Sequence, residues 1–127
     1  MAWGFNSQTS DDTEFLLAML ETGRARVPTH WYLEVCNALL VAQRAEMLTP
    51  AQTARFVGLL LALPIDADPT TSARALRETR RLAETEGVTS YDAAYLELAL
   101  REGLPLATLD KGMKRAAGSL GIPLLID

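Results

Sequence analysis

Three acidic residues occupy positions that local packing alone does not favour. Glu34 interrupts an apolar helical run, Asp92 falls in the first turn of an expected helix, and Asp110 follows a short apolar run typical of a buried strand. Burying a carboxylate is costly unless it is paired or binds a cation. Carboxylate oxygens are the ligands that Mg²⁺ and Mn²⁺ prefer. We therefore expect these three acids to be catalytic residues and ligands of a divalent metal ion.

Each acid also has a purely structural explanation. An aspartate at the start of a helix satisfies free N–H groups and complements the helix dipole, which accounts for Asp92 or Asp110 taken alone. Glu34 can reach solvent along one edge of its helix. Three acids at the ends of elements in one short chain nevertheless favour a shared metal site.

The other reactive residue types narrow the chemistry. Cys36 and His30 are each the only residue of their kind, which excludes a cysteine-based zinc site and a multi-histidine site. A lone cysteine in an apolar run is typical of core packing in a reducing compartment. Hydrolytic chemistry in this chain must therefore depend on carboxylates.

A carboxylate-bound Mg²⁺ or Mn²⁺ is suited to phosphodiester hydrolysis, because the cation activates water and stabilises charge on the leaving oxygen. A nucleic acid would be held partly through its phosphates. Lys111, Lys114 and Arg115 follow Asp110 directly and are candidate RNA-binding residues. Two other charged groups are expected on solvated faces: the pair Glu97 and Arg101, and the arginines at 74, 77 and 81.

Composition limits the class of protein. The chain has 127 residues, of which 49% are hydrophobic, and a net charge of −4. We expect one folded domain over residues 1–127 with no membrane-spanning segment. The N-terminus lacks the layout of a secretory signal, so a cytoplasmic location is expected. The acidic balance argues against coating of duplex DNA by bulk electrostatics.

Helical patterns alternate with short apolar runs along the chain. Ser10 or Asp11 begins the first expected helix, and Thr49 and Ser90 are expected to cap later ones. The helix that starts at Trp31 is so apolar that we expect it to be buried on most sides. The expected helices span residues 10–21, 31–44, 50–62, 70–87, 91–102 and 111–120, and the expected strands span 63–67, 104–109 and 122–126.

A strand, a helix and a strand fill the end of the chain from Leu104 to Ile126. Such a unit joins parallel strands by a right-handed crossover. The expected fold class is α/β with a small central parallel sheet flanked by helices. Ligands in this class lie beyond the carboxyl ends of the strands, and Asp110 falls at such a place.

Three segments of the sequence resemble the PIN-domain ribonucleases, in particular VapC toxins of bacterial toxin–antitoxin pairs. They read WYLEVCNALLVAQRAEMLTPAQ, SYDAAYLELALREGLPLATLD and KGMKRAAGSLGIPLL. In the order of its elements the resemblance extends over essentially the whole chain. The second segment is the most specific, since it carries a Tyr-Asp-Ala signature and ends in Thr-x-Asp. The resemblance implies a PIN-like three-layer domain.

The resemblance also implies an activity and a site. It implies an endoribonuclease toxin that uses Mg²⁺ or Mn²⁺ to cut single-stranded or looped RNA, including tRNA. Glu34, Asp92 and Asp110 match the family acids, and Thr108 matches a supporting polar residue. Ser90, at the start of the Tyr-Asp-Ala helix, is the second supporting candidate. The implied partners are a cognate antitoxin and a second copy of the chain.

The sequence departs from the family at its start. The family opens with an apolar strand of the form Val-x-Asp-x-Ser a few residues before the tryptophan that resembles Trp3, whereas this chain begins Met-Ala-Trp. We expect a central strand and the first acid of a quartet to be missing, through a late start, a truncation or degeneration. A sheet without its central strand exposes edges that favour swapping or dimerisation.

Two alternatives remain beside the ribonuclease. A catalytically silent relative would bind RNA or an antitoxin without cutting, and the sequence upstream of Met1 would discriminate between the two. A two-component receiver domain is also small, α/β and acidic. A receiver domain needs an acid pair after the first strand and a lysine after a late strand. Neither occurs here, so the sequence does not favour a receiver domain.

Overall fold

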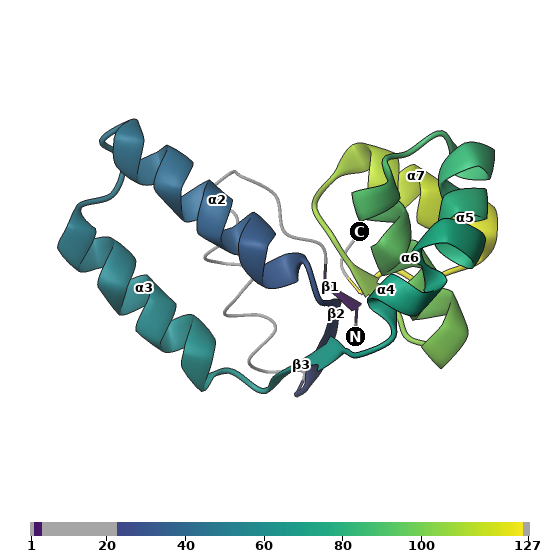
Figure 1. Ribbon diagram of the computed structural model, residues 1–127, viewed down its shortest axis with the longest axis horizontal. Helices are drawn as coiled ribbons and strands as arrows, with labels where there is room; N and C mark the ends of the chain where they lie inside the picture. Colours follow the sequence, from purple (N-terminus) through teal and green to yellow (C-terminus); the bar gives the residue numbers. More distant parts are fainter. Residues whose placement is uncertain (1, 4–22, 126–127) are drawn as a thin grey trace.

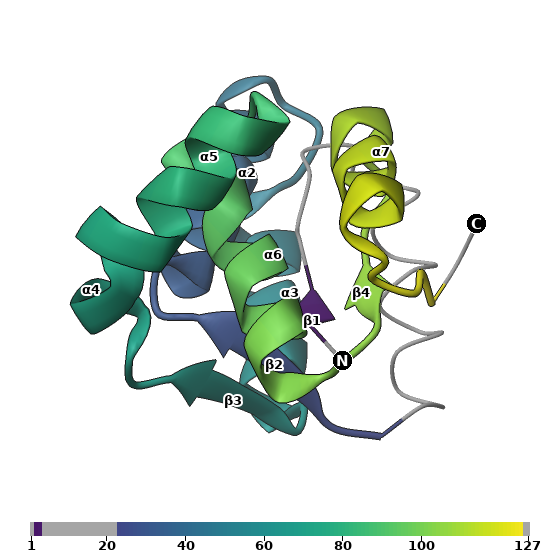
Figure 2. The same cartoon turned by 90° about the vertical axis from the view of Figure 1, so that its right-hand side faces the viewer.

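The computed structural model describes residues 2–3 and 23–125. A parallel sheet with strand order β3-β2-β1-β4 lies between helices on its two sides (Figures 1 and 2). The expected helix over 10–21 falls outside the described residues. The elements are β1 (Ala2–Trp3), β2 (Ala25–Pro28), α2 (Trp31–Arg44), α3 (Pro50–Ala62), β3 (Ile65–Asp68), α4 (Thr71–Arg74), the π-helix η1 (Ala75–Thr79), α5 (Arg80–Glu86), α6 (Ser90–Glu102), β4 (Leu106–Ala107) and α7 (Lys111–Leu120).

The expected α/β class with a small parallel sheet is confirmed. The expectation that no central strand remains is wrong in one respect, because Ala2–Trp3 pairs with both β2 and β4. β2 is a strand that was not among the expected ones. The last strands are shorter than expected: β4 has two residues, and the final run contributes a single bridge between Leu106 and Leu124.

Local capping signals explain the helices that were predicted well. Thr49 and Gln52 form a reciprocal capping box at the start of α3, with Pro50 at the first helical position. Asp110 caps α7, whose last turn ends at Gly121 in the left-handed region. The expected helix over 70–87 is instead interrupted by η1. No described helix has the length and apolar character needed to cross a membrane.

Helix α6 is the centre of the hydrophobic core. Seven consecutive residues, Ala93 to Ala99, are buried between the sheet and the flanking helices. They include Glu97, whose exposed fraction is only 6%. The expected pairing of Glu97 with Arg101 is confirmed, at 2.7 Å, but its expected place on the solvent face is wrong. The helix is covered on several sides, so helical spacing alone could not place that residue.

Glu97 belongs to a buried ionic cluster. Arg74 Nη1 lies 3.2 Å from Glu97 Oε1, and Arg101 contacts both Glu97 and Asp68. Arg74 therefore reaches the cluster although its side chain stays 37% exposed, whereas the arginines at 77 and 81 are exposed as expected. Burial acts to raise the pKa of Asp68, but hydrogen bonds from Arg101 and Thr70 outweigh it and hold that pKa below its ordinary value of 3.8.

The depressed pKa of Asp68 predicts an acid-dependent contribution to stability. Its ionised form stabilises the fold above the unfolded pKa near 3.8, and this contribution is lost as pH falls through the lower folded pKa. The difference in free energy of unfolding between the wild type and Asp68→Asn should be constant at pH 5–7 and shrink below about pH 4. Urea titrations from pH 7 to 2.5 measure it. A difference that grows in acid would contradict the assignment.

Candidate active site

The three sequence-predicted acids all lie near the carboxyl edge of the sheet. Glu34 is in the first turn of α2, which follows β2, and Asp110 begins α7 after β4. Asp92 is in the first turn of α6, which crosses back over the sheet (Figure 2). Parallel strands end at one edge, where helix N-termini also converge. The topology therefore brings three distant stretches of sequence to the same region.

Asp92 and Asp110 are electrostatically coupled. The pKa of Asp92 is raised, first by burial and next by the like charge of Asp110. The hydrogen bond with Thr89 and the proximity of His30 act in the opposite direction. Two carboxylates that repel each other in a partly buried place attract a cation. The donor chemistry of this pair fits Mg²⁺, which proteins commonly bind through one or two carboxylates.

Glu34 lies beside two aromatic side chains whose role the sequence did not reveal, and one of them holds its carboxylate. The buried hydroxyl of Tyr95 donates a hydrogen bond to Glu34 Oε1, and His30 Nε2 lies 3.6 Å from the same oxygen. The Tyr95 ring is 1% exposed, and burial together with Glu34 raises its pKa. Tyr95 therefore stays protonated and orients the carboxylate. The sequence held one indication of this role: Tyr95 follows Asp92 by three residues, so the two side chains lie on the same face of the helix.

Asp110 is fixed by its own turn. Its Oδ2 accepts a hydrogen bond from the Met113 N–H at 2.9 Å, and its N–H donates to Thr108 Oγ1 at 3.1 Å. Thr108 is 2% exposed, so that hydroxyl is rigidly held. A Cβ at Gly112 would lie 3.2 Å from Asp110 Oδ2. A side chain at position 112 would therefore crowd the carboxylate.

Ser90 does not cap α6, and that expectation is wrong. The cap is Thr89, whose extended backbone lets its hydroxyl accept the Asp92 N–H at 3.1 Å. Ser90 is instead the first helical residue and is exposed. The expected cap was wrong by one residue because Thr89 and Ser90 are adjacent and each carries a hydroxyl that could cap the helix. Thr89, rather than Ser90, fixes the backbone of Asp92.

The described residues do not gather all three acids into one ligand set. Within residues 2–3 and 23–125, no group of three His, Cys, Asp or Glu side chains lies close enough together to hold a metal ion. Asp92 and Asp110 form the electrostatic pair, while Glu34 is joined to it through Tyr95, whose pKa both Glu34 and Asp92 raise. Asp92 and Asp110 are therefore the two acids whose charges act on each other directly.

Basic residues flank the acids on one side. Lys111, Lys114 and Arg115 lie in the first turns of α7, immediately after Asp110. In the part of the chain that the structure describes, none of these three cations takes part in an ion pair. Their charges are therefore available to an anionic ligand that reaches the acidic pair.

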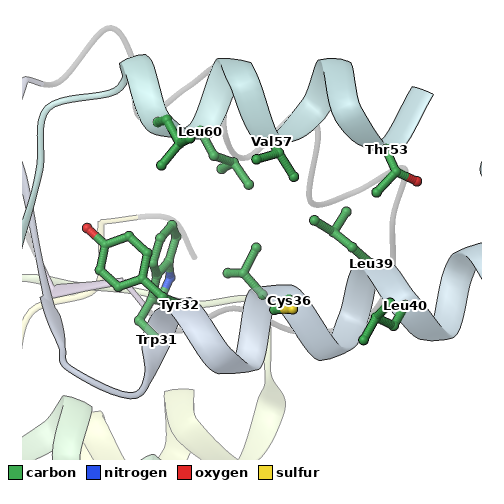
Figure 3. A pocket seen from close by; sticks show the side chains of 10 residues that line it. Trp31, Tyr32, Cys36, Leu39, Leu40, Thr53, Val57 and Leu60 are labelled. Carbon is green, nitrogen blue, oxygen red and sulfur yellow. The ribbon is translucent and has the colours of Figure 1, made fainter. Parts of the chain in front are cut away.

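A second feature is an apolar groove between α2 and α3 (Figure 3). It encloses about 240 Å³, and Leu39 and Val57 extend into it from the two helices. Tyr32 is 43% exposed, so the expectation that the helix from Trp31 is buried on most sides is wrong. Cys36 is also exposed, not packed in the core. The two helices form an arm that projects from the sheet, which leaves these apolar residues uncovered (Figure 1).

The fold is that of the PIN domain. A family model for the PIN domain matches residues 1–119, and the chain belongs to this family. It is 34% identical over 110 residues to ribonuclease VapC3 of Mycobacterium tuberculosis, in two strains, covering 87% of this chain and 77% of that protein. Its fold resembles the crystal structure of PAE2754 from Pyrobaculum aerophilum, with a TM-score of 0.62, 24% identity, and coverage of 84% of this chain and 76% of that one. The chain is thus a PIN-domain protein of the VapC type.

Proposed function

We propose that this protein is a divalent-metal-dependent endoribonuclease, the toxin of a toxin–antitoxin pair. The observation that carries the proposal is the coupled pair Asp92 and Asp110 at the carboxyl edge of the sheet, with Glu34 held beside it. The similarity to ribonuclease VapC3 supports RNA as the substrate. Single-stranded or looped RNA, including tRNA, is the substrate class that the family resemblance implies.

The two aspartates would hold Mg²⁺ or Mn²⁺, with Glu34 adjoining. Such a cation supplies Lewis acidity toward a phosphodiester and lowers the pKa of water. Glu34 stays oriented by the Tyr95 hydroxyl, so it can accept a proton from an attacking water or hold that water in place. Lys111, Lys114 and Arg115 would bind phosphates on either side of the bond that is cut.

Protein partners belong to the same proposal. The expected partners are a cognate antitoxin and a second copy of the chain, acting in the cytoplasm. Exposed apolar side chains on α2 and α3, among them Leu33 at 74% and Leu61 at 73% exposure, provide surface of the kind that protein partners cover. Gel filtration of the chain alone and of a co-expressed pair tests both partners.

A catalytically silent module is the second candidate, and one observation favours it. The described residues place no third acid with Asp92 and Asp110. The deciding experiment incubates the purified chain with a structured RNA pool, with Mn²⁺ or with EDTA. Cleavage that needs Mn²⁺ supports the enzyme. RNA that is bound but left intact in both conditions supports the silent module.

Removing the Tyr95 hydroxyl should weaken cleavage without unfolding the chain. Tyr95→Phe releases the Glu34 carboxylate, and loss of such a supporting hydrogen bond typically costs about 10- to 100-fold in activity. The loss should fall on kcat rather than KM, because no substrate contact is removed. Tyr32→Phe, at an exposed tyrosine of the α2–α3 groove, is the matched control. Equal rates in the two variants would refute the positioning role of Tyr95.

A further inference from the structure

A second hollow lies beside the acidic edge and has a different chemistry from the α2–α3 groove. It encloses about 220 Å³ and is lined by the end of β2 and the starts of α4 and α6 together with η1. Its polar lining consists of hydroxyl groups, and its rim carries one imidazole and one phenol ring. The hydroxyl residues are Thr29, Thr71, Ser72, Thr79 and Ser90.

Thr79 is the most deeply buried of the hydroxyl residues that line the hollow. It is 5% exposed and lines the hollow, yet within the described part of the chain its hydroxyl makes no hydrogen bond. The hydroxyl oxygen itself is not fully buried, so it is open to hydrogen bonding by a molecule in the hollow. Thr79 also lies in the π-helix η1, and π-turns inside helices occur frequently at functional sites. Both observations favour a ligand at this place.

The charge, size and polarity of the lining indicate which kind of ligand the hollow can bind. Apart from His30, none of the residues that line the hollow is basic, so it offers no charge to a phosphate. Its volume is below the roughly 300–1,000 Å³ of sites for drug-sized molecules. Hydroxyls can both donate and accept hydrogen bonds, and the Tyr91 ring is 62% exposed for stacking. A small, neutral, planar group with polar edges fits these properties.

The hollow and the acidic edge share a wall. His30 Nε2 lies 3.1 Å from the Tyr91 carbonyl, and since a carbonyl can only accept, Nε2 carries the proton. The same nitrogen lies 3.6 Å from Glu34 Oε1. Tyr91 directly precedes Asp92, and its ring packs edge-on against His30. A ligand that spans both places would therefore pass over His30 and Tyr91.

We infer that this hollow binds one unpaired nucleobase of the RNA, adjacent to the phosphate that is cut. This inference rests on the proposed ribonuclease function and adds a source of sequence preference to it. The base stacks on Tyr91, and its polar edge meets the hydroxyls of Thr79 and Ser90. Recognition of single-stranded RNA commonly combines stacking on aromatic rings with hydrogen bonds to base edges.

A binding experiment tests the hollow without requiring cleavage. Adenosine, guanosine, cytidine and uridine, which carry no phosphate, are titrated in EDTA into ¹⁵N-labelled protein. We expect amide shifts at Thr79, Ser90 and Tyr91 with at least one nucleoside, weakened about 5- to 100-fold in Tyr91→Ala. Tyr32→Ala removes an equally large exposed ring from the α2–α3 groove and should change nothing. Absence of shifts around the hollow with all four nucleosides would overturn the inference.

A cleavage experiment tests the same residues in the reaction. RNAs randomised around one cut site are digested by the wild type, by Thr79→Val, which is nearly isosteric, and by Tyr91→Ala at a largely exposed position. Preference at one nucleotide beside the cut should flatten in both variants. A preference unchanged in both would count against the base site.

The two experiments separate the base site from the ribonuclease itself. Nucleoside binding at Thr79 and Tyr91 in a protein that never cuts RNA would retain the base site and remove the enzyme. Cleavage that needs Mn²⁺, with no nucleoside binding and an unaltered preference, would retain the enzyme and remove the base site.

Discussion

Asp92→Asn is expected to lower the rate of Mn²⁺-dependent RNA cleavage by about 100-fold or more. The amide cannot serve as an anionic ligand, and loss of several kcal/mol of charge stabilisation corresponds to at least two powers of ten in rate. Asparagine keeps the size of the side chain and its capping ability. Initial rates on one labelled RNA substrate measure the effect.

The same substitution should leave the fold intact or strengthen it. In EDTA the half-buried Asp92 carboxylate faces the like charge of Asp110. Removing it should raise the free energy of unfolding by up to about 1 kcal/mol, as is common when a functional site is relieved of strain. Asp66→Asn is the matched control, because Asp66 pairs with the exposed Arg24 on another strand. Full cleavage by Asp92→Asn would contradict its role.

Arg101→Met should produce a large loss of stability. The substitution leaves the carboxylates of Asp68 and Glu97, with side chains 3% and 7% exposed, without their shared cation. Removing one partner of a buried ion pair costs about 3–5 kcal/mol. That is a large fraction of the roughly 5–15 kcal/mol by which domains are stable. Urea unfolding followed by circular dichroism measures it.

The chain offers an exposed pair for comparison. Arg80 and Glu84 are 2.7 Å apart with side chains 54% and 66% exposed, so Arg80→Met should cost no more than about 0.5 kcal/mol. Comparable losses in the two methionine variants would mean that the inner cluster is not a special source of stability.

The helices could be predicted because their signals are local. The capping box of Thr49 and Gln52, the glycines that end helices, and the Asp110 cap lie within a few residues of the boundaries they set. Tertiary contacts set the rest. Glu97 has the spacing of a surface residue, yet α6 is covered on several sides. The arm formed by α2 leaves its apolar residues exposed, which periodicity alone cannot reveal.

The sequence pointed to the three acids of the candidate site and to one residue that supports them, Thr108, which accepts the Asp110 N–H. It missed the residues around Glu34. Glu34, Asp92 and Asp110 stand out because charge is unusual in their local setting. Tyr95 and His30 do not stand out in this way, since an aromatic residue in or next to a helix is usually explained by core packing. Only the fold shows that Tyr95 reaches across from α6 to Glu34 on α2. The place of Thr79 in the hollow was not predicted, because no local sequence pattern indicates the π-helix that contains it.

Direct titration of Mn²⁺ into the metal-free chain, followed by electron paramagnetic resonance of the free ion, tests whether Asp92 and Asp110 hold a cation. The wild type and Asp66→Asn should bind Mn²⁺ with the same affinity, and Asp92→Asn and Asp110→Asn should each bind at least about 10-fold more weakly. Equal binding by all four proteins, or binding by none of them, would contradict the assignment of the metal to this pair.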